Sequence, residues 1–125
     1  MFRVIIAGTR SFDDYALLCE VADKLLKEKS AAGEQIVIIS GHCAGADILG
    51  ERYARERGYA VELFAAEWGL YGRSAGPRRN RAMAEAADAL IAFWDGMSRG
   101  TLNMIQEARA RGLAVRVKQY KTVEE

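Results

Sequence analysis

Five short apolar runs alternate with longer segments of helical spacing, and this alternation restricts the fold more than any other feature. The first run, residues 2–7, is rich in β-branched residues, and continuous apolar runs are typical of strands buried on both faces of a parallel sheet. Strands are expected over residues 2–7, 35–39, 59–64, 89–93 and 113–117. Helices are expected over residues 13–31, 44–57, 78–87 and 101–111.

The connecting segments carry signals of their own. Ser11 and Asp14 form a capping arrangement before the first helix, and Pro77 stands near the first turn of the third, where its missing N–H costs least. Residues 65–76 are expected to form a long irregular stretch, and loops of this length are often functional. Residues 118–125 are expected to form a polar, frayed tail.

Alternating strands and helices predict an α/β protein with one parallel sheet covered by helices on both faces. Because crossover connections are right-handed, we expect a Rossmann-like three-layer fold with about five strands in the order 3-2-1-4-5. Residues 1–125 are expected to form a single domain. In such sheets, ligands bind at the carboxyl ends of the strands, near the point where the strand order reverses.

Composition narrows the functional classes. Half of the residues are hydrophobic and 28% are charged, which indicates a globular domain. The net charge of +1 does not favour nucleic acid, and no stretch is long and apolar enough to span a membrane. Cys19, Cys43 and the single histidine, His42, lack the spacing of a closed metal site. Reduced thiols, no metal ion and a cytoplasmic location are therefore expected.

Two glycine-containing loops, residues 40–47 and 92–101, follow apolar strands and lead into helices. The first N–H groups of a helix lack intrahelical partners, and glycine lets the backbone approach a ligand closely, so such loops suit a phosphate. We expect ligand contacts from these loops and from the end of the first strand. The candidates are Gly8, Thr9, Arg10, Gly41, Gly45, Asp47, Trp94, Asp95, Gly96, Ser98, Gly100 and Thr101.

Four arginines crowd into nine residues around the only proline: Arg73, Arg78, Arg79 and Arg81. Arg79 is the expected phosphate clamp, because a guanidinium can contact a phosphate through two donors. Its neighbour Asn80 is a further candidate contact. The other interpretation of Arg79 is a solvated helix residue.

Three candidates in the glycine loops keep two interpretations each. Asp47 and Asp95 suit either a ribose hydroxyl or a purely local role, Asp47 at a helix start and Asp95 in its loop. Trp94 suits either a nucleobase, to which it would offer an aromatic face, or the core.

Six separated blocks occur in one order: Gly8-Thr9-Arg10, Gly41, Gly45-Ala46-Asp47, Gly76-Pro77-x-Arg79-Asn80, Met83 and the stretch from Phe93 to Thr101. With these blocks the sequence resembles the SLOG superfamily, specifically its YspA-related branch of Rossmann-like proteins. The resemblance implies binding of nucleotides or nucleotide-derived ligands and a homodimer or larger assembly. The superfamily includes the Lonely Guy phosphoribohydrolases, which release a cytokinin base from its ribose phosphate, and the DprA proteins of DNA uptake.

The sequence differs from the phosphoribohydrolases at one residue that is implicated in their catalysis. In those relatives an Arg-Lys-x-x-Met segment and a later Pro-Gly-Gly-x-Gly-Thr-x-x-Glu segment supply an arginine and a glutamate implicated in catalysis. Here Arg79 keeps the arginine, but Met104 stands where the glutamate should be. Because methionine cannot act as an acid or base, a hydrolase would need Glu67, Asp47 or Asp95 instead.

Two functions are therefore expected from the sequence and its resemblance. The first is a nucleotide-binding module, either a sensor or an N-glycosidic or phosphoribosyl hydrolase. The alternative is a DprA-like module that binds single-stranded DNA or supports assembly through the four arginines, although nucleic acid is the less favoured partner. His42 and Cys43 stand where the branch usually has small residues, and we interpret both as tolerated variation.

Overall fold

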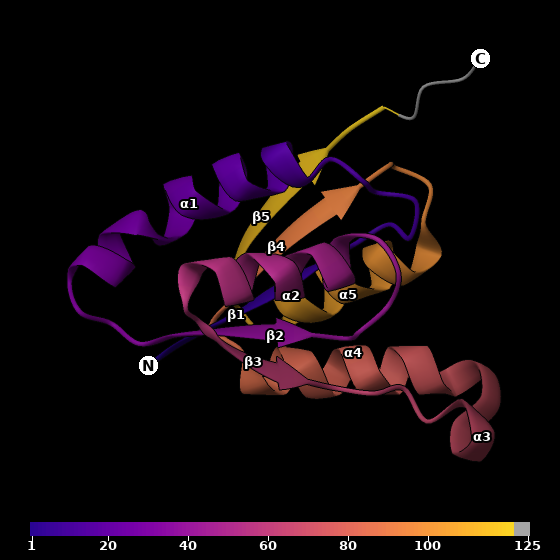
Figure 1. Cartoon of the computed structure of the whole chain (residues 1–125). Helices are drawn as coiled ribbons and strands as arrows, with labels where there is room; N and C mark the ends of the chain where they lie inside the picture. Colours follow the sequence, from indigo (N-terminus) through magenta and orange to yellow (C-terminus); the bar gives the residue numbers. More distant parts are fainter. Residues whose placement is uncertain (122–125) are drawn as a thin grey trace.

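A computed structural model describes residues 1–121 and shows one five-stranded sheet in the order β3-β2-β1-β4-β5. All of its strand pairs are parallel. The predicted α/β class and strand order are therefore confirmed. Figure 1 shows the strands, which are β1 (Phe2–Gly8), β2 (Ile36–Ser40), β3 (Ala60–Leu63), β4 (Ala89–Trp94) and β5 (Ala114–Gln119).

Four helices cover the two faces of this sheet (Figure 1). One face packs against α1 (Tyr15–Ala31) and α2 (Ala46–Arg57), and the other against α4 (Ala75–Ala86) and α5 (Arg99–Ala110). The sheet separates two cores because alternate side chains of a strand point to opposite faces. Along β1, Val4 and Ile6 join the first core, whereas Ile5 and Ala7 join the second.

Helix α1 shows how the sequence positions a helix on the sheet. Its buried residues, Leu18, Ala22 and Leu26, recur every four positions and so form one stripe that faces the core. Burying a leucine side chain contributes roughly 1.5 to 3 kcal/mol. The carboxylate of Asp14 accepts the Leu17 N–H at 3.0 Å, so the N-cap is Asp14 and Ser11 does not take that role.

Residues 65–76 are more ordered than the sequence indicated. They contain the short helix α3 (Trp68–Tyr71), a 3₁₀ turn (Gly72–Ser74) and the start of α4 at Ala75. The predicted long irregular stretch was therefore wrong. Pro77 is the third residue of α4, where an N–H has no intrahelical partner, so the helix continues through the proline.

The two edges of the sheet also differ from expectation. Ala60, Val61 and Leu63 in β3 are exposed, because β3 is an edge strand and is not covered on both faces as predicted. Strand β5 continues to Gln119 and pairs with β4 as far as Trp94, so the start of the predicted polar tail is part of the sheet. The rest of that predicted tail, residues 122–125, lies outside the described residues.

Within residues 1–121, none of the helices has the length and apolar character that crossing a membrane requires.

The carboxyl end of β1 is held by close contacts between backbones. The Thr9 N–H donates to the Phe93 carbonyl at 3.0 Å, and the Thr9 carbonyl accepts the Phe12 N–H at 3.1 Å. Gly45, which precedes α2, has φ +86°, and a Cβ atom there would lie 2.5 Å from the Arg10 carbonyl oxygen. A glycine at this position therefore lets the start of α2 approach the loop after β1.

A pair of glycine substitutions tests this close approach. Gly33 has a similar φ of +82°, but a Cβ added there would have no neighbouring atom within 4 Å, so Gly33→Ala should cost only roughly 1 to 2 kcal/mol of backbone strain. Gly45→Ala should lower the free energy of unfolding by roughly 1 to 3 kcal/mol more, because its Cβ meets backbone atoms. Urea denaturation measures both, and equal losses would contradict the close approach.

Candidate functional site

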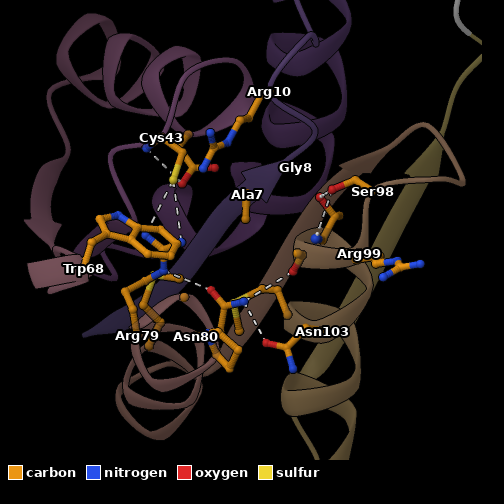
Figure 2. Close-up of a pocket in the computed structure, with 17 residues that line it drawn as sticks. Ala7, Gly8, Arg10, Cys43, Trp68, Arg79, Asn80, Ser98, Arg99 and Asn103 are labelled. Atoms are coloured by element: carbon orange, nitrogen blue, oxygen red, sulfur yellow. Dashed lines mark hydrogen bonds between the residues drawn. The ribbon is translucent and has the colours of Figure 1, made fainter. Parts of the chain in front are cut away.

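A cavity of about 320 Å³ lies at the carboxyl ends of the central strands, next to β1, where the strand order reverses. The loops after β1 and β2, the short helix α3 and the first turns of α4 and α5 form its walls (Figure 2). Eight residues proposed from the sequence line it. They are Gly8, Arg10, Asp47, Arg79, Asn80, Ser98, Gly100 and Thr101.

Arg79 on α4 connects that helix to the loop after β2. Its Nη1 donates to the Gly41 carbonyl at 2.9 Å, and both terminal nitrogens lie 3.6 Å from the Cys43 sulfur (Figure 2). A Cβ on Gly41 would lie 2.6 Å from that Nη1 and 2.9 Å from Asp47 Oδ2. The missing side chain at Gly41 therefore allows the guanidinium and the Asp47 carboxylate to approach the same loop.

Asn80 extends this connection to the opposite wall. Its Oδ1 accepts the Arg79 Nε–H at 3.0 Å, while its Nδ2 donates to the Asn103 Oδ1 at 2.9 Å and to the Gly100 carbonyl at 3.3 Å. Asn80 is buried, so its side chain needs these partners. The chain of hydrogen bonds holds α4 and α5 at a fixed separation across the cavity.

The N-terminus of α5 faces the cavity. Ser98 is the N-cap, and its hydroxyl oxygen accepts from the Thr101 N–H at 3.3 Å and from the Thr101 hydroxyl at 3.1 Å. Within residues 1–121, the structure records no partner for the N–H groups of Arg99 and Gly100. Unpaired N–H groups together with the helix dipole favour an anion at this end.

Asp47 is a buried carboxylate in the wall opposite α5. It is only 4% exposed, and its Oδ2 accepts the Cys43 N–H at a long 3.4 Å. Burial raises the pKa of Asp47 from 3.8 to about 6, although the Cys43 N–H and the Arg79 charge oppose that rise. Near neutral pH this carboxyl group is therefore able to take up or release a proton.

Trp68 from α3 forms another part of the wall (Figure 2). A Cβ on Gly76 would lie 3.3 Å from the indole Cη2, so a larger residue at Gly76 would crowd the ring. Trp68 is 52% exposed, which leaves ring surface available to a ligand. From the sequence, Trp68 was predicted to lie in a loop and was not included among the residues of the site.

Several residues proposed for the site do not line the cavity. Thr9, Gly41 and Gly45 shape the loops behind it, and Gly96 lies in the loop before α5. The indole of Trp94 is half-buried, packs against the second core and donates to the Ser98 carbonyl at 3.1 Å, which agrees with the core interpretation of this residue.

Two of the three carboxylates proposed as catalytic, Asp95 and Glu67, also lie outside the lining. Asp95 Oδ1 accepts the N–H groups of Met97 at 2.8 Å and Ser98 at 2.9 Å, and these bonds hold the pKa of Asp95 below its usual range. The Asp95 carboxylate therefore stabilises the turn in which it lies. Glu67 is the exposed N-cap residue of α3. Of the three replacement carboxylates, the structure brings only Asp47 into the cavity.

Other lining residues were not proposed as ligand contacts from the sequence. Arg99, Asn103 and Met104 line the cavity from one side of α5, and Met83 lines it from α4. Asn103 lies four positions after Arg99, and Met104 lies four positions after Gly100, so these residues share one side of a helix. This spacing was the signal in the sequence that could have identified them. Met104 is buried, so the position at which the hydrolase relatives carry glutamate supplies a thioether here.

The four clustered arginines point to different partners. Arg78 lies over the ring of Tyr71, with its Cζ 4.3 Å from the ring centroid, and Arg81 pairs weakly with Glu107 at 4.0 Å. Arg73 is exposed in the 3₁₀ turn. Within the part of the chain that the structure describes, only Arg79 of this cluster lines the cavity.

A family model described as the YspA, cpYpsA-related SLOG family matches residues 2–71. The chain belongs to this family. It is also 36% identical over 121 residues to the Gene 61 protein of Mycobacterium phage D29, covering 92% of this chain and 94% of that protein. The family expected from the sequence is thus confirmed.

Two solved structures have a similar fold. DNA processing protein A (DprA) from Streptococcus pneumoniae matches 98% of this chain with a TM-score of 0.71 and 17% identity, and the match spans 52% of the DprA chain. The protein TM1055 matches 92% of this chain and 72% of its own, with a TM-score of 0.65 and 19% identity. This chain therefore spans about half the length of DprA, and both likenesses concern the fold.

The raised pKa of Asp47 predicts how the stability of the fold depends on pH. Between about pH 4 and pH 6 the folded protein keeps a proton that the unfolded chain has lost, so the contribution of Asp47 to stability is present below pH 4 and is lost as the pH rises through 6. Asp47→Asn should gain roughly 3 kcal/mol relative to the unsubstituted protein over that interval. Urea denaturation at several pH values measures the difference, and a difference that does not change with pH would contradict the buried carboxylate.

Proposed function

We propose that the cavity binds a nucleotide or nucleotide-derived molecule through its phosphate. The observation that carries this proposal is that the Arg79 guanidinium and the N-terminus of α5 face one cavity. A guanidinium supplies a charge that is independent of pH, and a helix N-terminus supplies unpaired N–H groups. Both features recognise an anion with several oxygen atoms, as a phosphate group is.

The cavity has two chemically different ends. The N-terminus of α5 suits the phosphate, whereas the Asp47 carboxylate would repel a phosphate and suits a donor such as a ribose hydroxyl. Trp68 offers an aromatic face for the base. A cavity of about 320 Å³ lies at the small end of the usual range for ligand sites, which favours a single nucleotide unit.

The binding proposal predicts a loss of affinity in two variants. Arg79→Ala should weaken binding of adenosine 5′-monophosphate roughly 10- to 150-fold, because it removes a charge-assisted hydrogen bond worth about 1.5 to 3 kcal/mol. Thr101→Val should weaken binding as well, because the Thr101 hydroxyl donates to Ser98 and so holds the N-terminus of α5 in place. Isothermal titration calorimetry measures the affinity. Circular dichroism of each variant shows whether it is folded.

Arg81→Ala is the matched control, because Arg81 is on the same helix as Arg79 but does not line the cavity. Unchanged affinity in both test variants would remove the site assignment. The DNA-binding alternative predicts a different result: a single-stranded oligonucleotide would bind with strongly salt-dependent affinity, and Arg78→Ala and Arg81→Ala would weaken it as much as Arg79→Ala does.

We also propose that the site cleaves an N-glycosidic bond, with Asp47 in the catalytic role. The support is that Asp47 lines the cavity and has a pKa of about 6, so it is able to accept a proton near neutral pH. In this reaction Asp47 takes a proton from water as the oxygen attacks C1′ of the ribose. The C1′–N bond breaks, its electron pair leaves with the base, and the base takes a proton from solvent.

Asp47→Asn should therefore abolish release of the free base from nucleoside 5′-monophosphates, with a loss of kcat of at least about 100-fold. Chromatographic detection of the free base measures the rate. Glu67→Gln is the matched control and should keep the full rate, because Glu67 is exposed outside the cavity. Equal activity of Asp47→Asn and the unsubstituted protein would overturn the role of Asp47.

A further inference from the structure

A second cavity, of about 280 Å³, lies on the face of the sheet that packs against α1. Its floor is the amino-terminal half of β1, β4 and β5, and one of its walls is the second half of α1. The first cavity lies at the carboxyl ends of the strands. The two cavities are therefore at opposite ends of the sheet, and the proposed nucleotide site does not use the second one.

Small side chains in neighbouring strands leave this space open. Ala89 of β4 and Ala114 of β5 are partners in the sheet register, so their side chains point to the same face. A methyl group fills little of the distance between a sheet and a helix, and Ala114 is exposed. On this face α2 packs on β1, β2 and β3, so within residues 1–121 only α1 is left to cover β4 and β5 (Figure 1).

The walls of the second cavity are mostly apolar. Phe2 and Val4 contribute from β1, and Leu25 and Leu26 contribute from α1. Leu26 is buried in the first core, but Leu25 is 40% exposed although its side chain is large and apolar. Such walls favour an alkyl chain, because each CH₂ group that they remove from water strengthens binding roughly fourfold.

Two basic residues also line the second cavity, and within residues 1–121 no carboxylate does. Lys29 lies four positions after Leu25 on the same side of α1, with its Nζ 4.3 Å from the centroid of the Phe2 ring. Arg116 is exposed on β5. The part of the chain that the structure describes has no salt bridge to either cation. The Glu34 carboxylate near Lys29 pairs with the amino terminus at 2.9 Å.

We propose that the second cavity binds an aliphatic carboxylate, with the alkyl chain on the apolar walls and the carboxylate at the two cations, Lys29 and Arg116. The charges are complementary, and an exposed cation prefers a carboxylate to a neutral hydroxyl group. A volume of about 280 Å³ is small for a ligand site, so one chain of medium length fits. This inference is independent of the proposed nucleotide site.

A series of carboxylates of increasing length tests the apolar walls. Isothermal titration calorimetry on the full chain compares hexanoate, octanoate and decanoate. Each step adds two CH₂ groups and should strengthen binding by up to about 15-fold, the value for complete burial of both groups. Octan-1-ol has an alkyl chain of the same length as octanoate and no charge. It should bind roughly 3- to 10-fold more weakly, because exposed ion pairs contribute modestly.

Two substitutions test the position of the alkyl chain. Ala114→Phe should weaken decanoate binding at least about 10-fold, because the added ring occupies the cavity and removes contacts with several CH₂ groups. Ala114 is exposed, so the ring is not forced into the core. Leu25→Gln is a second variant at an exposed helix position, and it should also weaken binding by removing part of the apolar wall. Circular dichroism shows whether each variant is folded.

A double substitution tests the two cations. Lys29→Ala combined with Arg116→Ala should make the affinities for octanoate and octan-1-ol equal, because the alkyl contacts remain and the charges are gone. Lys27→Ala combined with Lys118→Ala is the matched control. These lysines are on the same helix and the same strand but do not line the cavity, so the preference for octanoate should persist.

The contradicting results are specific. Lack of saturable decanoate binding would overturn the inference, as would an affinity that does not rise with chain length. Equal binding of octanoate and octan-1-ol to the unsubstituted protein would overturn the role of the cations. In ¹H–¹⁵N NMR spectra, decanoate should shift signals from the second half of α1 and the amino ends of β4 and β5. Shifts confined to the first cavity would overturn the assignment of the site.

Discussion

The hydrogen bond from Arg79 to the Gly41 carbonyl is the interaction on which the geometry of the site depends. It joins the helix on one face of the sheet to a loop that leads into the helix on the other face. Through Asn80 the same connection reaches α5. A guanidinium suits this position because it supplies donors to several partners at once and still carries its charge to the cavity.

A consequence of this arrangement is that two helix starts at one sheet edge have different chemical roles. At α2 the structure places its own carboxylate, Asp47, where it accepts the Cys43 N–H. At α5 the first N–H groups face the cavity and only a serine caps them. In the proposed nucleotide complex, this difference would place the phosphate at α5 and the sugar near Asp47, because a carboxylate and a phosphate repel each other.

Sequence periodicity was sufficient for the fold, because the apolar runs of β1, β2 and β4 are central strands and right-handed crossovers leave few topologies. Periodicity overestimated the burial of β3, because β3 lies at the edge of the sheet. The position of a strand in the sheet is set by tertiary structure, which the local pattern does not show. Glycine positions and a family resemblance located Gly8, Arg79 and Thr101 at the cavity. They could not separate Asp47 from Asp95, because each carboxylate follows a strand in sequence and only the local turn shows that Asp95 is already bonded to its own backbone. Trp68 was not assigned to the site because its position depends on the packing of α3 against Gly76.

The proposal that this cavity holds a phosphorylated nucleotide, or a derivative of one, is open to a direct test. Native mass spectrometry of the freshly purified protein, followed by denaturing release of any small molecule, identifies what the chain carries. We expect one phosphorylated nucleotide-derived molecule per chain, either retained through purification or acquired on incubation with a mixture of nucleoside 5′-monophosphates. A chain that stays without any such ligand under both conditions would contradict the proposed site.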